Sequence, residues 1–280
     1  MFYPNLTQQE LAIAGYIYGE CCYNGYGGEP DYDLAWKLFV VSADRGSKDA
    51  RLRLGRLVCK RMYRLNDEES KNTILQFVKS EADNGDSEAQ YLTGMLIYHL
   101  YFSSKDKWKE KKRLSYAYLE KGGNNNHIKA QKELVRLFYL NKDAEYADTI
   151  KAVSVLGSLS NIGDSVSQCI LGKLALQGKI KNFDASNGVE QIKKSSRAGY
   201  LPALALLGAL YYTGEGVEQN DSIAINYYKK YLSQKQKFDY DKNGIYAEAV
   251  LGNYYYDSGY YENAVKYYSK ANSRMLCESA

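Results

Sequence analysis

The feature that most constrains this chain is a glycine pattern that returns after nearly constant intervals. A glycine is followed four positions later by a small residue and nine positions later by a second glycine, as in Gly199, Ala203 and Gly208. We take the last position as a marker, which falls at residues 15, 55, 94, 135, 172, 208 and 252. Successive markers are 40, 39, 41, 37, 36 and 44 residues apart. A period of this length indicates a stack of repeated supersecondary units.

Each repeat is expected to form two antiparallel helices. The first helix, here called helix A, carries the marker, and the second, helix B, has apolar residues at helical spacing, such as Ile223, Tyr227 and Tyr231. The first glycine of the pattern follows helix B, where a left-handed residue ends a helix at little cost. A glycine inside a helix costs about 1 kcal/mol relative to alanine. Its repeated use at the marker therefore predicts a close contact between helices rather than a catalytic role.

One stretch of the chain has a recognisable family pattern. The segment Ala205-Leu-Leu-Gly208-Ala-Leu-Tyr211-Tyr-Thr-Gly214-Glu-Gly216-Val217, followed by Asp221 and Ala224, resembles the Sel1-like repeat. The tract 188–199 resembles the second helix and closing turn of the same repeat. The resemblance extends over nearly the whole chain. It is strong in the sixth repeat, good in the second, third and fifth, and weak in the fourth, whereas the last repeat is more similar to an ordinary tetratricopeptide.

The resemblance implies an all-α fold, a right-handed α/α solenoid (superhelix) of about seven helix-pair repeats. One such pair cannot bury its apolar face alone, so neighbouring repeats must stack. We expect a single repeat domain over residues 1–280, with repeats near 5–45, 46–84, 85–125, 126–162, 163–198, 199–242 and 243–273.

The resemblance also implies where a partner would bind, because helix A lines the concave side in such folds. Tetratricopeptide geometry places the residues at −6, −3, +1, +4 and +5 from the marker on that side. From the second to the fifth repeat these positions hold six basic and two acidic residues, with interleaved tyrosines. Arginine and tyrosine are enriched in binding sites. The alternative is a solvated face with incidental charge. The candidate partner-binding residues of the groove are Arg56, Lys60, Tyr91, Met95, Tyr98, His99, Lys132, Arg136, Tyr139, Lys173, Tyr212, Tyr246 and Tyr256.

Composition gives little support to other kinds of function. The chain has 37 basic and 33 acidic residues without a charged tail, which does not favour nucleic acid. Its two histidines lack the close ligand pairs of a metal site. Ser104 and Lys107 match S-x-x-K, the nucleophile motif of penicillin-recognising enzymes, but the companion motifs S-D-N and K-T-G are missing. The glycines of Gly25–Gly28 could suggest a phosphate-binding loop, but no strand precedes them and no G-K-[ST] follows. We therefore expect no catalytic, cofactor-binding or metal-binding residues.

The start of the chain has no cationic segment followed by an apolar one, and no apolar run approaches the length of a membrane span. The five cysteines are odd in number and irregularly spaced, which favours free thiols in the cytoplasm. The tetratricopeptide offsets given above, which we call the projection, place Cys59 and Cys169 in the groove. These two cysteines are therefore expected to be the most accessible.

These features together predict a cytoplasmic, non-enzymatic protein that binds a partner protein with an acidic surface or segment, and neither nucleic acid nor a membrane. It would act as an adaptor or regulator, and an immunity protein that neutralises a bacterial toxin is the specific form considered first. A scaffold or assembly factor in a larger complex is the alternative, and a hydrolase is a distant one.

Overall fold

The computed structural model describes residues 6–140, 147–180, 183–234 and 242–276. Fourteen α-helices and one short π-helical segment contain 79% of these residues, and no strand occurs among them. This confirms the all-α solenoid class that the repeat pattern predicts. The chain divides into two compact modules, an N-terminal module of residues 1–148 and a C-terminal module of residues 149–280.

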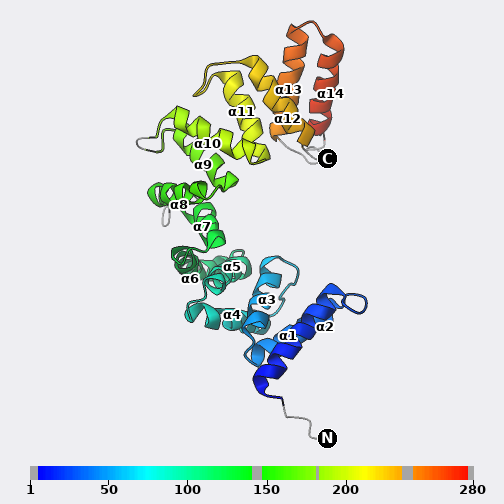
Figure 1. Cartoon of the computed structure of the whole chain (residues 1–280), viewed down its shortest axis with the longest axis vertical. Helices are drawn as coiled ribbons and strands as arrows, with labels where there is room; N and C mark the ends of the chain where they lie inside the picture. Colours follow the sequence, from blue (N-terminus) through cyan, green and yellow to red (C-terminus); the bar gives the residue numbers. More distant parts are fainter. Residues whose placement is uncertain (1–5, 141–146, 181–182, 235–241, 277–280) are drawn as a thin grey trace. The chain divides into compact units, whose positions relative to one another are not determined.

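In six of the repeats, consecutive helices pack side by side as helix A and helix B (Figure 1). The N-terminal module contains three such pairs: α1 (Gln8–Asn24) with α2 (Tyr32–Asp44), α3 (Lys48–Cys59) with α4 (Glu68–Asp83), and α5 (Ser87–Tyr101) with α6 (Lys105–Asn124). The C-terminal module contains α9 (Ser165–Leu176) with α10 (Ala185–Arg197), α11 (Leu201–Thr213) with α12 (Asp221–Gln234), and α13 (Lys242–Asp257) with α14 (Tyr261–Leu276).

The fourth predicted repeat, 126–162, is divided between the modules. Its helix A, formed by α7 (Ile128–Leu134) and the π-helical segment η1 (Val135–Tyr139), ends the N-terminal module. Its helix B, α8 (Thr149–Asn161), begins the C-terminal module. The π-helical segment starts at Val135, where the other repeats have a glycine marker. A single repeat domain over the whole chain stays a prediction.

The marker glycines lie where helix A meets helix B most closely. A Cβ atom added to Gly94 would lie 2.6 Å from Leu119 Cγ, and one added to Gly208 would lie 2.6 Å from Tyr228 Cε1. Real Cβ atoms essentially never approach a neighbour so closely. The contacts agree with the predicted packing role of these glycines.

The marker of the first repeat is Gly19, so the choice of Gly15 was wrong by about one helical turn. A Cβ atom at Gly19 would lie 2.6 Å from Phe39 Cε1. Phe39 in α2 is equivalent to Val78 in α4, which lies against the Gly55 marker. Each of the two residues lies seven positions before the glycine that closes its repeat, Gly46 or Gly85.

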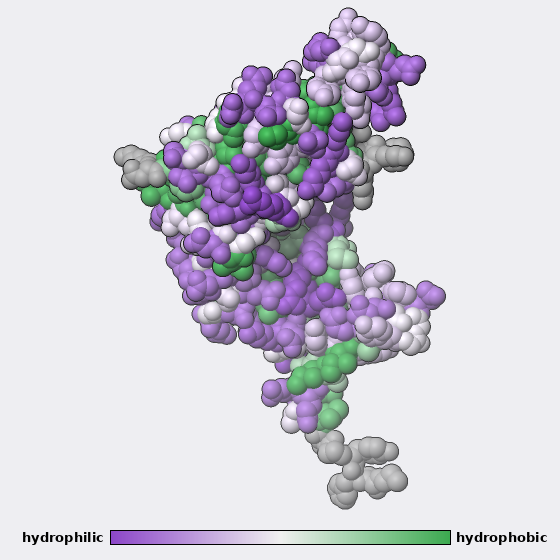
Figure 2. Space-filling model, turned by 45° about the horizontal axis from the view of Figure 1, so that its top comes forward, coloured by the Kyte–Doolittle hydropathy of each residue, from purple (hydrophilic) through white to green (hydrophobic). Residues whose placement is uncertain are grey.

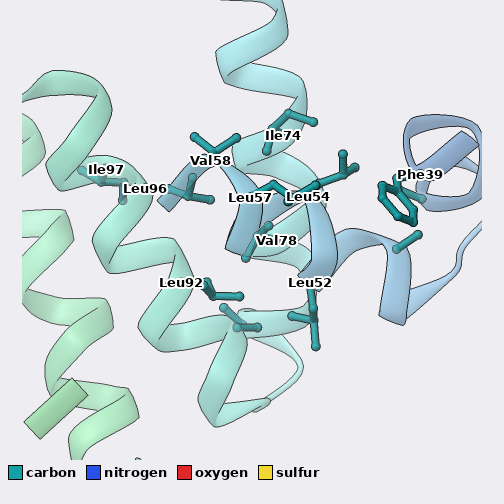
Figure 3. Packing of buried hydrophobic residues seen from close by; sticks show 14 of the residues in the cluster. Phe39, Leu52, Leu54, Leu57, Val58, Ile74, Val78, Leu92, Leu96 and Ile97 are labelled. Atoms are coloured by element: carbon teal, nitrogen blue, oxygen red, sulfur yellow. The ribbon is translucent and has the colours of Figure 1, made fainter. Parts of the chain in front are cut away.

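The hydrophobic core of the N-terminal module is shared between successive repeats. Buried side chains from α2, α3, α4 and α5 point toward one another, including Phe39, Leu54, Val78 and Leu96 (Figure 3). In the C-terminal module, one cluster forms around Ile192 and Leu207, and a second joins α11, α12 and α13. Each repeat is therefore stabilised by its neighbours in sequence, as in other repeat proteins.

Candidate protein-binding surface

The exposed sides of the A helices form a strip of charged and aromatic residues in the N-terminal module. We call it the A-helix strip, and it consists of Glu20 on α1, Arg53, Arg56 and Lys60 at α3, Glu88, Tyr91, Tyr98 and His99 on α5, and Lys129, Lys132, Glu133 and Arg136 on α7 and η1. Helix periodicity places these side chains away from the buried faces of α3 and α5.

Ion pairs join neighbouring A helices along this strip. Arg53 on α3 pairs with Glu20 on α1, with 2.8 Å between Nε and Oε1. Arg56 donates two hydrogen bonds of 2.8 Å to Glu88 on α5, one from Nε and one from Nη2. The hydrogen bonds from Arg56 hold the pKa of the Glu88 carboxyl below its usual value. Because bidentate pairs restrict both side chains, these contacts hold the four paired residues in defined positions.

The positive charge of the strip is smaller than the projection suggests. Arg56 is paired with Glu88, and Arg136 is paired with Glu133 at 2.6 Å between Nη2 and Oε2. The projection omitted Glu133 because its offset of −2 is not assigned to the groove. It omitted Glu20 because it began at the second repeat, although Glu20 lies at offset +1 from Gly19. Within the part of the chain that the structure describes, Lys60 and Lys129 are exposed and form no ion pair.

Aromatic side chains form two contacts on the same strip. Tyr91 stacks on His127, the residue before α7, with ring centroids 4.9 Å apart, and burial raises the pKa of Tyr91 to about 12. Tyr98 stacks on Phe102 at 4.8 Å and meets the edge of Trp108 at 5.4 Å. The projection missed Phe102 and Trp108, although Phe102 lies four residues after Tyr98 and a helix brings such residues together.

His99 lies beside this aromatic cluster, and its ring meets Tyr98 edge-on with centroids 5.7 Å apart. Burial lowers the pKa of His99. His99 is therefore neutral over a wider pH range than a solvated histidine.

Two of the predicted groove residues are buried in the core, and the projection is wrong for them. Met95 is 4% exposed and Tyr139 is 5% exposed, so neither offers a surface to a partner. Met95 directly follows the Gly94 marker, on a helix that is buried on most of its sides. Tyr139 ends the π-helical segment, whose wider turn changes the direction of its side chains relative to the α-helical offsets.

The cysteines also differ from their expected placement. Cys169 is buried, and the Cys59 thiol lies close enough to the Leu92 carbonyl oxygen, at 3.9 Å, to donate a weak hydrogen bond. Burial raises the pKa of Cys59 to about 12 and also raises that of Cys169. Cys169 is therefore not an accessible thiol, whereas Cys59 is half-buried, as are Cys21 and Cys22, and the four described cysteines are free. Cys277 lies outside the described residues.

The remaining predicted residues lie in the C-terminal module. Lys173 on α9 is exposed, Tyr212 on α11 is half-buried, and Tyr246 and Tyr256 on α13 are exposed. The A-helix strip is defined within the N-terminal module, so these four residues are not part of it.

The described residues contain no group of three or more histidine, cysteine, aspartate or glutamate side chains that could hold a metal ion. The helices described here also include none that combines the length and the hydropathy of a membrane span.

Comparisons with known proteins agree with the fold. The Sel1 repeat family model matches residues 12–47, 87–127, 201–232 and 245–274. The resemblance of the third and sixth repeats is thereby confirmed. The second and fifth, for which a good match was expected, lie outside the matched residues, and the last repeat matches the Sel1 model rather than an ordinary tetratricopeptide alone.

Two solved structures are similar to this chain. The crystal structure of a Sel1 repeat protein from Oxalobacter formigenes has a TM-score of 0.68 and 22% identity, covering 94% of this chain and 73% of that one. A protective antigen present in uropathogenic Escherichia coli strains, which displays an SLR fold, has a TM-score of 0.48 and 20% identity, covering 95% of this chain and 62% of that one. A search of the curated proteins found no match.

Sel1 repeat proteins generally mediate protein–protein interaction, and the family is not known for enzymes. The repeated helix pairs, the glycine contacts between their helices and the four matched stretches have one explanation: this chain belongs to the Sel1 repeat family.

Proposed function

We propose that this protein is a non-enzymatic adaptor or regulator that binds a partner protein through the A-helix strip of its N-terminal module. The observation that carries the proposal is the set of cross-helix ion pairs, Arg53 with Glu20 and Arg56 with Glu88, which order half-buried surface side chains on three successive A helices. Side chains that are ordered before binding lose less conformational entropy when a partner is bound.

The chemistry of the strip favours an acidic partner segment. Lys60 at the end of α3 and Lys129 on α7 are exposed, and both are free of ion pairs in the described structure. The aromatic cluster of Tyr98, Phe102 and Trp108 offers an apolar surface beside these charges, since Phe102 is exposed. A partner segment that combines carboxylates with one or two apolar side chains fits both features.

Toxin neutralisation in a bacterial cytoplasm is one specific form of this binding, and scaffolding of a larger assembly is the other. A toxin gene beside the gene for this protein would support immunity. Stable co-purification with several subunits would support scaffolding. In either form the partner would bind the same strip.

The test begins with capture of the partner from native lysate and its identification by mass spectrometry. Affinities are then measured at low and high salt for a double variant, Lys60→Glu with Lys129→Glu. We expect roughly tenfold weaker binding at low salt and a smaller loss at high salt, because the lost attraction is screened. Tyr98→Ala should weaken binding with little salt dependence, because it removes packing area.

The matched control is Lys37→Glu with Lys109→Glu, which changes the net charge equally at exposed positions of α2 and α6. Equal effects of the two double variants would contradict binding at the strip. Reversal of Lys132 and Arg136 is less suitable, because Arg136 is paired with Glu133. Lys193 is also a poor control residue, since its Nζ lies 5.8 Å from the centre of the Tyr211 ring.

A further inference from the structure

The outer face of α1 carries apolar residues that are open to solvent. Ile13 is 48% exposed, Ile17 and Tyr18 are each 55% exposed, and Ala14 is also exposed. Figure 2 shows hydrophobic atoms grouped on the surface where α1 lies. We call these four residues the head face. A repeat whose outer face is not covered by a neighbour normally has a polar face there, so this apolar face requires an explanation.

The equivalent positions are buried in every later repeat. Counted from the marker, Ala14 and Tyr18 lie at positions −5 and −1 relative to Gly19. In the six later repeats these two positions hold Ala50 and Leu54, Ala89 and Thr93, Ala130 and Leu134, Ser167 and Leu171, Ala203 and Leu207, and Ala247 and Leu251, and all twelve residues are buried. The first repeat differs because no described repeat precedes it.

The contact between α12 and α13 shows what covers these positions. Ile13, Ala14, Ile17 and Tyr18 correspond to Tyr246, Ala247, Val250 and Leu251 of α13. The last three belong to one hydrophobic cluster with Ile225 and Tyr228 of α12, and the Tyr246 ring meets the Tyr228 ring edge-on at 6.2 Å. The head face therefore has the chemistry of a helix A surface that packs against the helix B of a preceding repeat.

The last helix of the chain, α14, presents the other half of this contact. Tyr268 corresponds to Tyr228, because each lies against the marker glycine of its own repeat. Val265 then corresponds to Ile225. Ile225 and Tyr228 are 3% and 1% exposed, whereas Val265 and Tyr268 are 63% and 38% exposed. We call Val265 and Tyr268 the tail face.

We propose that a second copy of this chain covers these surfaces, with the tail face of one copy packed against the head face of the next. A second copy fits because one chain carries both surfaces of the contact. The tail face corresponds to the surface of α12, and the head face corresponds to the surface of α13 that packs against it. Tyr268 would lie against the partner's Ile13 as Tyr228 lies against Tyr246. Val265 would lie against the partner's Ile17 and the partner's Tyr18, whose counterparts Val250 and Leu251 share one hydrophobic cluster with Ile225. Such a heterologous contact lets copies add successively until a ring closes or a filament forms.

Sedimentation of the full chain at increasing concentration tests this association. We expect the weight-average mass to rise above 31.8 kDa for the native chain. Ile17→Lys changes the head face and Val265→Lys changes the tail face. Each variant alone should abolish the rise in weight-average mass, because it introduces a charge into the apolar contact. Val41→Lys is the control, since Val41 is an exposed apolar residue of α2 outside both faces.

Mixing the two variants distinguishes head-to-tail association from a symmetric dimer. Ile17→Lys retains an intact tail face and Val265→Lys an intact head face, so an equimolar mixture should form a dimer and nothing larger. If head packed on head, Val265→Lys alone would still dimerise and the proposal would be wrong. A native chain that stays monomeric up to a concentration of about 1 mM, roughly a thousand times a micromolar Kd, would also overturn the proposal. Circular dichroism of both variants checks that they remain folded.

This association uses surfaces outside the A-helix strip. Loss of self-association in Ile17→Lys with unchanged partner binding would therefore leave the proposed function intact, and the reverse result would leave the association intact.

Discussion

A marker glycine places a backbone hydrogen where any larger group would meet the opposite helix. At Gly208, a Cβ atom would lie 2.6 Å from Tyr228 Cε1 and 2.8 Å from Cδ1. Tyr228 is among the largest fully buried side chains, so its ring has little room to move. The glycine therefore sets how closely α11 and α12 can pack.

We predict that Gly208→Ala lowers the free energy of unfolding by about 1–3 kcal/mol, and that Gly208→Leu lowers it further, because overpacking forces the helices apart. The free energy would be measured by urea unfolding followed by circular dichroism. Gly157→Ala is the matched control in α8, where a Cβ atom would have no neighbour within 4 Å. It should raise stability by about 0.5–1 kcal/mol, since alanine favours the helix. Equal shifts in the two variants would contradict the packing role of Gly208.

At the scale of a single element, α7 depends on a histidine for its first turn. Nδ1 of His127 accepts a hydrogen bond from the Ala130 N–H at 3.2 Å, and the imidazole stacks on Tyr91. Burial lowers the pKa of His127, and Lys129 acts in the same direction, whereas Glu88 and Asp86 oppose it. A protonated Nδ1 cannot accept this hydrogen bond, so acid removes the cap.

This arrangement makes stability depend on pH in a definite direction. The pKa of His127 is lower in the folded state, so the unfolded chain binds the proton more readily. The stabilisation from the neutral ring is therefore complete only above the pKa that His127 has in the unfolded chain. It is lost as the pH falls from about 7 through the lowered folded pKa. We predict that His127→Asn, which keeps a capping side chain, loses less stability than the native protein between pH 7.5 and pH 5. Urea unfolding at both pH values measures this difference, and an equal loss in the two proteins would show that another group is responsible.

At the scale of the whole molecule, each module has its own core. The cluster that contains Phe39, Leu54 and Leu96 lies within residues 1–148, and the clusters around Leu207 and Leu251 lie within residues 149–280. Contacts between successive repeats supply most of the stability of a repeat protein, so a module with three packed helix pairs has what it needs to fold.

We predict that residues 1–148 and 149–280, produced as separate chains, each remain helical and unfold cooperatively in urea. The measurement is circular dichroism at 222 nm, a standard helix band, across a urea titration. The native chain is the reference for helix content. A fragment without a cooperative transition would show that its module depends on the other one.

The sequence by itself determined the helix pairs and the positions where they touch. The glycine spacing predicts the repeats because the contact between helix A and helix B joins residues close together in the chain, so each repeat encodes it again. The family resemblance rests on the same glycine spacing, because the family pattern includes the small residues at the contact between helix A and helix B. The spacing led to Gly15 as the first marker, and the contact of Gly19 with Phe39 corrects that choice.

Only the tertiary structure decided which side chains of the A helices remain exposed and how their charges pair. Arg53 meets Glu20 and Arg56 meets Glu88 across different repeats, and the burial of Met95 and Tyr139 depends on the helices around them. The exposure of the head and tail faces likewise depends on whether a neighbouring repeat is present. A periodic pattern describes one repeat and its own internal contact, whereas exposure and ion pairing are properties of each repeat together with the neighbours packed against it.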